Sequence, residues 1–209
     1  MRLPLFNPTR AGYCSCPPKY NLNTYLGACE HGCLYCYARK FPSFNGPARP
    51  RLSLLSEIEG IVKRTKPRLP VVMSDCTDPY QPLERKYEVT RRCADVLVKN
   101  RFPLLIVTKS ALVTRDADVL RKNLGVVALS VTSLEDDVMR VIEPNAPRAE
   151  DRIEALAHLS NIGVTCICRI DPIIPGVNDD PEEFDELVKR LSEVGVKQVT
   201  IATMKPVRG

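Results

Sequence analysis

After residue 50 the chain alternates between two hydrophobic patterns. Apolar residues recur at helical spacing within Arg51–Lys66, and the short apolar run Leu69–Met73 that follows is typical of a buried strand. The same alternation repeats to the end of the chain. Further strands are predicted at Leu104–Thr108, Val126–Val131, Val164–Ile170 and Gln198–Thr203. Helices are predicted near Pro82–Asn100, near Asp116–Asn123, shortly after Leu134, near Arg148–Ile162 and at Pro181–Val194.

Residues at the helix ends support this interpretation. Asp180-Pro181-Glu182-Glu183 provides an N-cap, a first-turn proline and acidic side chains beside the positive end of the helix dipole. Gly163 and Gly195 stand where a helix commonly ends in a left-handed residue. Strands that alternate with helices at this spacing predict a parallel α/β fold. An open partial barrel and a doubly wound sheet both fit the pattern.

Polar and small residues follow the predicted strands. In parallel α/β folds the carboxyl ends of the strands form the edge at which ligands bind. We therefore expect the chemistry of the chain to gather on one face. These residues are Ser74 to Asp78, Thr108-Lys109-Ser110, Thr132-Ser133, Asp171-Pro172 and Met204-Lys205.

Composition indicates a soluble chain with one domain as the default. It is 44% hydrophobic and 26% charged over 209 residues, without an apolar run long enough to cross a bilayer. The N-terminus lacks the apolar core and cleavage site of a secretory signal, so we expect a cytoplasmic protein without membrane association. In a reducing compartment, nine cysteines favour metal binding or catalysis over disulfides.

The net charge of +5 is concentrated in residues 1–50, which carry six basic residues and one acidic residue. A basic surface suits a phosphate-bearing partner such as nucleic acid, although a solvated face has the same composition. Residues 1–50 lack sustained periodicity, and we expect them to be irregular and dominated by loops.

Three thiols lie within eight residues, at Cys29, Cys33 and Cys36. A structural zinc site needs four closed ligands, and Cys14, Cys16 or His31 could supply the fourth. Iron–sulfur clusters are normally held by four thiolates, so a loop with three would leave one iron open to a non-protein ligand. Cys14 and Cys16 could also cap such a cluster, bind zinc themselves or hold nothing.

The Cys-x3-Cys-x2-Cys spacing, with an aromatic residue before the last cysteine, resembles the signature of the radical S-adenosylmethionine (SAM) superfamily. The wider resemblance is to its spore photoproduct lyase-like branch. The similar stretches are Asn23 to Arg39, Thr77 to Pro82, Val107 to Ser110, Ser130 to Thr132, Glu143-Pro144, Arg152 to Ala155 and Pro172 to Gly176.

This resemblance implies a TIM-like partial (β/α)6 barrel at residues 25–209, with strand one just before Cys29, and an irregular basic extension at 1–24. It implies a [4Fe-4S] cluster on the three cysteines and SAM on the open iron. In that family an electron from the cluster cleaves SAM to a 5′-deoxyadenosyl radical, which abstracts hydrogen from a substrate.

The resemblance also implies residues that bind the cofactor. The loop from Ser74 to Asp78, including Asp75 and Thr77, is expected to receive the amino group of SAM, mostly through its backbone. Lys109 and Ser130 are expected to contact the methionine carboxylate, for which an ammonium at a strand end is chemically suited. Arg169 would be costly to bury unpaired, which makes it a candidate for the same carboxylate or for a substrate anion.

Three further residues have candidate catalytic roles. Cys76 resembles the lyase cysteine that donates a hydrogen atom to the product radical, and the alternative is a small residue that happens to end a strand. Tyr35 and Tyr37 resemble the lyase tyrosines thought to relay an electron and a proton back toward SAM. Packing around the adenine and the cluster is the alternative role. Cys166 and Cys168 share a strand face opposite Arg169, so we expect them to pack outward as buried thiols.

The leading hypothesis is therefore a radical SAM enzyme, with a damaged nucleic acid base as a candidate substrate and ferredoxin or flavodoxin as the candidate electron donor. The sequence stops directly after the sixth predicted strand, where the lyase continues into a segment that helps hold DNA. A truncated chain, a different substrate and a covering partner chain all fit this difference. The alternative function is a non-enzymatic iron–sulfur or zinc protein that binds nucleic acid or a protein partner.

Overall fold

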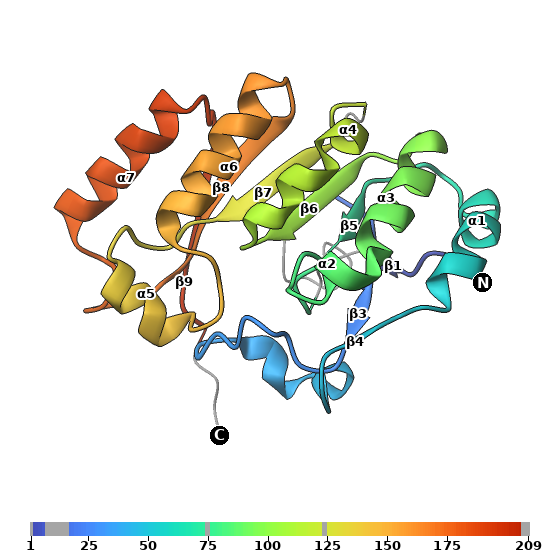
Figure 1. Ribbon diagram of the computed structural model, residues 1–209, viewed down its shortest axis with the longest axis horizontal. Helices are drawn as coiled ribbons and strands as arrows, with labels where there is room; N and C mark the ends of the chain where they lie inside the picture. The colour runs from blue at the N-terminus through green and yellow to red at the C-terminus, as the bar shows by residue number, and fades with distance from the viewer. Residues whose placement is uncertain (1, 7–16, 74–75, 123–124, 206–209) are drawn as a thin grey trace.

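The computed structural model describes residues 2–6, 17–73, 76–122 and 125–205. Within these residues, strands form one seven-stranded sheet with the order β1-β2-β5-β6-β7-β8-β9, and β3 pairs with β4 separately (Figure 1). Within the described part of the seven-stranded sheet only β1 runs antiparallel to its neighbour, so six parallel strands make the partial barrel that the resemblance implied. The strands are β1 Leu5–Phe6, β2 Lys19–Leu22, β3 Tyr25–Leu26, β4 Arg49–Pro50, β5 Val71–Met73, β6 Leu104–Thr108, β7 Val126–Ser130, β8 Thr165–Ile173 and β9 Val199–Thr203.

Helices connect the parallel strands and cover one face of the sheet. Helix α3 packs on β6, and α6 packs on β7 and β8; these helices stand in front of the sheet in Figure 1. The α-helices are α1 Leu54–Arg64, α2 Glu84–Tyr87, α3 Val89–Lys99, α4 Ala117–Leu120, α5 Asp136–Ile142, α6 Ala149–Asn161 and α7 Pro181–Glu193. The described residues also form three short 3-10 helices, which are η1 Tyr37–Lys40, η2 Pro42–Phe44 and η3 Ala111–Asp116.

The N-terminal segment differs from the expectation. Residues 1–24 were expected to be irregular, but β2 lies there and is the first parallel strand of the sheet. Tyr20 and Leu22 are 4% and 3% exposed and face the core, while Lys19 and Asn21, which alternate with them, are polar and half-buried. Two inward residues are too few to be recognised as a strand in the sequence. Pairing of Tyr20 with Val71 on β5 supplies the rest of the stabilisation.

Two predicted helices have different boundaries in the structure. The helix near Pro82–Asn100 is divided into α2 and α3 at Glu88, which has a left-handed backbone with φ of 49°. The helix near Asp116–Asn123 begins earlier as the 3-10 helix η3 and continues as the single turn α4. The predicted caps are confirmed, because the Asp180 carboxylate accepts hydrogen bonds from the backbone of Glu182 and Glu183.

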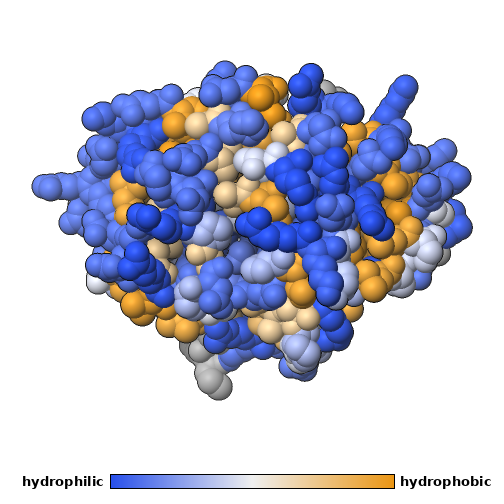
Figure 2. Space-filling model, viewed as in Figure 1, coloured by the Kyte–Doolittle hydropathy of each residue, from blue (hydrophilic) through white to orange (hydrophobic). Residues whose placement is uncertain are grey.

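The surface seen from the helix-covered side is largely hydrophilic, with scattered apolar patches (Figure 2). None of the helices in the described ranges has the length and apolar content needed to span a membrane. The blue segment between β3 and β4, which contains the three clustered cysteines, lies along the lower edge in Figure 1. There it faces the ends of the central strands.

Candidate functional site

A cavity of about 490 Å³ lies between this segment and the carboxyl ends of the strands. Its volume is in the range of sites that enclose a small molecule or cofactor. It brings together most of the site residues predicted from the sequence. These are Cys29, Cys33, Tyr35, Cys36 and Tyr37 from the loop, and Cys76, Asp78, Lys109, Ser130 and Arg169 from the strand ends.

The side chain of Thr77 does not join them. It is 3% exposed, and its hydroxyl donates a hydrogen bond of 3.0 Å to the backbone carbonyl of Tyr25. Thr77 therefore fixes β3 against the loop after β5, and the cofactor-binding role expected for it does not extend to this side chain. Ser74 and Asp75 lie outside the described residues, as do Cys14 and Cys16.

The clustered thiols lie in an environment that disfavours free thiolates. Burial raises the pKa of Cys29 to about 12, with Asp78 adding to the effect, and raises the pKa of Cys33 to about 11 against the opposing charge of Lys109. Thiolates at these positions need a cation to stabilise them, as metal ligation does. In the described residues no three Cys, His, Asp or Glu side chains surround a single ion position. The fit to an iron–sulfur cluster therefore rests on three neighbouring thiols that share one cavity.

Backbone contacts hold the cysteine loop in place. The amide of Leu34 donates to the carbonyl of Ile142 at 2.9 Å, and the Arg39 guanidinium donates to the carbonyls of Gly32 and Cys33 at 2.9 and 2.8 Å. The loop begins at Gly27, whose φ is +77° and whose Cβ would lie 2.1 Å from the Pro47 carbonyl oxygen. These contacts fix the loop through the backbone and leave the thiols available.

Asp78 connects the loop to the strand ends. Its carboxylate accepts hydrogen bonds from the Thr108 hydroxyl at 2.6 Å and from the backbone amides of Lys109 and Tyr80 at 2.7 and 2.8 Å. The His31 imidazole lies 3.2 Å from the same carboxylate. Burial opposes both charges, but the ion pair outweighs it, so the pKa of His31 is raised and that of Asp78 is lowered. Asp78 lines the cavity, and its carboxylate already has these four partners.

Glu143 is the centre of a buried charge cluster that sequence reasoning missed as a site. Its carboxylate lies 3.2 Å from the Lys109 ammonium and 2.6 Å from the Arg152 guanidinium, and it accepts hydrogen bonds from Thr132 and Tyr35. Burial alone would raise the pKa of Glu143, but Lys109 and Arg152 outweigh it and lower this pKa to about 2. The pKa of Tyr35 is raised by burial and by the Glu143 charge.

The buried charges of Glu143, Lys109 and Arg152 leave a net positive charge beside the cavity. Lys109 and Arg152 are cationic and Glu143 is anionic, so one positive charge remains uncompensated, and Lys109 lines the cavity. Arg152 also donates to the Ser130 carbonyl at 3.0 Å, which fixes the end of β7. The arrangement suits a ligand with a carboxylate. The sequence carried a signal for Arg152, because an arginine on the same face of α6 as apolar Ile153 and Leu156 is buried and needs a charged partner.

The remaining predicted residues lie at the rim or in the core. The Arg169 guanidinium pairs with Asp171, and both are about 30% exposed and line the cavity. The Ser43 hydroxyl lies 3.8 Å from the Cys76 sulfur. Cys166 and Cys168 are 6% and 0% exposed, which confirms the expected buried thiols on the face away from Arg169.

Comparisons with known proteins agree with this architecture. An uncharacterised protein of Methanocaldococcus jannaschii is 34% identical over 165 residues, which cover 77% of this chain and 62% of the relative. Among solved structures, a spore photoproduct lyase variant with bound S-adenosylmethionine and dinucleoside spore photoproduct has a TM-score of 0.69 and 17% identity, covering 88% of this chain and 56% of that one. SuiB of Streptococcus suis bound to S-adenosylmethionine has a TM-score of 0.68 and 16% identity, covering 90% and 41%.

The chain thus spans about three fifths of the M. jannaschii relative. The sequence profile described as the Radical SAM superfamily matches residues 24–191, which include the three clustered cysteines and β5 to β8. Members of that family are enzymes that use a [4Fe-4S] cluster and SAM. Because the match covers most of the chain and agrees with the barrel and the cysteine loop, the chain belongs to the radical SAM superfamily.

Proposed function

We propose that Cys29, Cys33 and Cys36 hold a [4Fe-4S] cluster, and that this chain cleaves SAM reductively to abstract hydrogen from a substrate. When bound, the cluster supplies the electron that divides SAM into methionine and a 5′-deoxyadenosyl radical. The observation that carries the proposal is the single cavity shared by the three thiols and the cationic strand end at Lys109. A three-thiolate loop leaves one iron for a non-protein ligand, and the cavity has room for one.

The strand ends bind and orient the cofactor in this proposal. Lys109 offers its ammonium and Ser130 its hydroxyl to the methionine carboxylate, while Glu143 and Arg152 hold the two strand ends in position. Arg169 also lines the cavity, paired with Asp171, and is available to a second anionic group. Asp78 acts by fixing the Lys109 backbone and His31, and the loop from Ser74 to Asp78 receives the SAM amino group through its backbone.

Cys76, Tyr35 and Tyr37 take part in the later steps in this proposal. Cys76 faces the cavity, and its S–H bond is weak enough to donate a hydrogen atom to a carbon radical of the product. Tyr35 and Tyr37 flank Cys36 and line the same space, where they pack beside the cofactor and are placed to return an electron and a proton.

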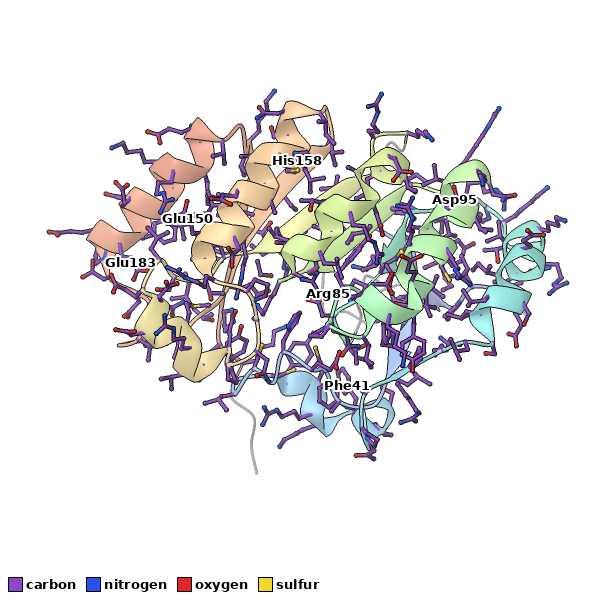
Figure 3. All side chains as sticks on the ribbon, viewed as in Figure 1. Phe41, Arg85, Asp95, Glu150, His158 and Glu183 are labelled. Atoms are coloured by element: carbon purple, nitrogen blue, oxygen red, sulfur yellow. The ribbon has the colours of Figure 1, made fainter. Side chains whose placement is uncertain are left out.

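For the substrate we propose a damaged nucleic acid base. Tyr37 and Lys205 line the cavity, and the Lys205 ammonium lies 5.1 Å from the centroid of the Tyr37 ring. Phe41 packs edge to face on Tyr37, with 5.7 Å between the ring centroids. Tyr37 is 46% exposed and Phe41 is 38% exposed. Phe41 lies on the segment between β3 and β4, at the lower edge of Figure 3. Exposed aromatic rings beside cations are typical of surfaces on which bases stack next to phosphates.

An electron donor is also required, and we propose a carrier such as ferredoxin or flavodoxin. The described cysteines are all free thiols, which fits the reducing cytoplasm in which such carriers operate.

The cluster and SAM cleavage can be tested together. Anaerobically reconstituted protein should bind about four iron atoms per chain. With dithionite it should convert SAM to 5′-deoxyadenosine and methionine, and alanine at Cys29, Cys33 and Cys36 together should abolish both results. Bound zinc without SAM cleavage would favour the non-enzymatic function instead.

The substrate proposal has a separate test. Fluorescence anisotropy should show tighter binding of an ultraviolet-irradiated thymine oligonucleotide than of the same strand before irradiation. Tyr37→Ala and Lys205→Ala should weaken that binding. The matched control Lys189→Ala, an exposed lysine on α7, should not weaken it. Equal binding by all three variants and the parent protein would contradict a nucleic acid substrate at this rim.

A further inference from the structure

Glu143 contacts both the cysteine loop and the strand ends. It is 1% exposed, and its carboxylate meets Tyr35 from the loop, Lys109 after β6 and Arg152 on α6. In the proposed function, the negative charge of Glu143 serves only to hold Lys109 and Arg152 in position. A buried carboxylate is costly to maintain, and it changes the energy of any charge that is added nearby.

The Tyr35 hydroxyl lies between two acceptors. It donates to the Glu143 carboxylate, and hydrogen bonding from the same side chain lowers the pKa of Cys33 against the larger effect of burial. A phenol has one O–H and can donate it to one acceptor at a time. A carboxylate is the stronger acceptor, so Glu143 keeps the proton of Tyr35 turned away from Cys33.

Both features affect a cluster held by Cys33. Reduction adds one negative charge to the cluster, and a neighbouring buried anion opposes it. A hydrogen bond donated to a ligand sulfur favours reduction, because it stabilises the added charge. Glu143 therefore acts against reduction twice, through its own charge and by withholding the Tyr35 hydrogen bond.

We propose that Glu143 is a positioning residue that keeps the reduction potential of the cluster low. This inference rests on the proposed function, because it requires a cluster on Cys33. Glu143 touches neither substrate nor cluster in this account and acts through Tyr35, Lys109 and its own charge. A low potential makes the reduced cluster a stronger donor toward SAM.

The first test is Glu143→Gln, which removes the charge and keeps the shape. Both proteins are reconstituted anaerobically and titrated without SAM at one fixed pH, with the reduced cluster followed by electron paramagnetic resonance. We expect the reduction equilibrium of the variant to shift in favour of the reduced cluster by about tenfold, which is about 59 mV for one electron. An unchanged potential in a variant with wild-type iron content would overturn the proposal.

A double-mutant cycle tests the part played by Tyr35. Tyr35→Phe alone should change the potential little, because its hydroxyl already donates to Glu143. In the Glu143→Gln background the same change should lower the potential, because a neutral amide is a weaker acceptor than a carboxylate and competes less with Cys33 for the Tyr35 hydroxyl. Equal effects of Tyr35→Phe in both backgrounds would refute the withheld hydrogen bond.

Lys109→Met provides a test that leaves the buried pair of Glu143 and Arg152 in place. Loss of this cation should lower the potential, opposite in sign to Glu143→Gln. The control Glu150→Gln removes a charge on α6 that pairs with Arg190 of α7, away from the segment between β3 and β4 in Figure 3, and should leave the potential unchanged. If the wild-type protein assembles no cluster, the proposed function fails. If the cluster assembles but Lys109→Met and Glu143→Gln shift its reduction potential in the same direction, only this inference fails.

Discussion

The imidazole of His31 lies 3.2 Å from the carboxylate of Asp78, with both side chains buried. Breaking such a pair from one side leaves a buried charge unpaired, and Asp78→Ala should cost about 3–5 kcal/mol of unfolding free energy. Removing both charges with His31→Leu and Asp78→Ala should cost less than the sum of the single changes. Urea unfolding of the four proteins measures this coupling. Additive losses would show that the two side chains do not stabilise each other.

Most of the sheet was predictable from the sequence, because β5 to β9 are short runs rich in apolar residues with a helix between each pair. Strand β2 was not predictable, because only Tyr20 and Leu22 face inward and the strand is stabilised by pairing with β5. The sequence also predicted that one site would contain the three clustered cysteines together with Lys109, Ser130 and Arg169. These residues line one cavity in the structure.

The supporting charges were harder to predict, because their roles depend on tertiary contacts. Glu143 follows α5 in a dipeptide, Glu143-Pro144, for which the resemblance implied no role, and it becomes central only where Lys109, Arg152 and Tyr35 converge on it. Thr77 shows the opposite case. It stands within a stretch that resembles a cofactor loop, but its hydroxyl bonds the Tyr25 backbone.

Lys109→Met should weaken SAM binding by about tenfold to a hundredfold, because one charge-assisted contact to the methionine carboxylate is lost. Equilibrium dialysis with the reconstituted protein measures the dissociation constant. Lys99→Met on α3, where the lysine pairs with exposed Asp95, is the matched control and should bind SAM as the parent does. Equal affinities for both variants would remove Lys109 from the carboxylate site.

Cys76→Ala should retain SAM cleavage and change the products formed from the substrate. The thiol lies in the cavity and is not one of the three proposed cluster ligands, so iron content should be unchanged. Without the S–H donor, the product radical should be quenched by other routes and yield a mixture. Chromatography of the products from an irradiated oligonucleotide measures the partition. An unchanged product distribution would mean that Cys76 does not donate hydrogen.

Acid should destabilise the protein through Glu143. Burial opposes its charge, but Lys109 and Arg152 lower its pKa from 4.5 to about 2. A carboxyl whose folded pKa is depressed stabilises the fold above its unfolded pKa, and this contribution is lost as the pH falls from about 4.5 through 2. The difference corresponds to stabilisation on the order of 3 kcal/mol.

Glu143→Gln has no such proton to gain, so its unfolding free energy should fall less steeply than that of the parent between pH 4.5 and pH 2. Urea unfolding of both cluster-free proteins across this interval measures the two slopes. Asp118→Asn is the control, because this exposed carboxylate pairs with Arg91 at the surface and solvent screens the pair. Its pH dependence should stay close to that of the parent. Parallel curves for Glu143→Gln and the parent would show that Glu143 does not carry its charge into the folded state.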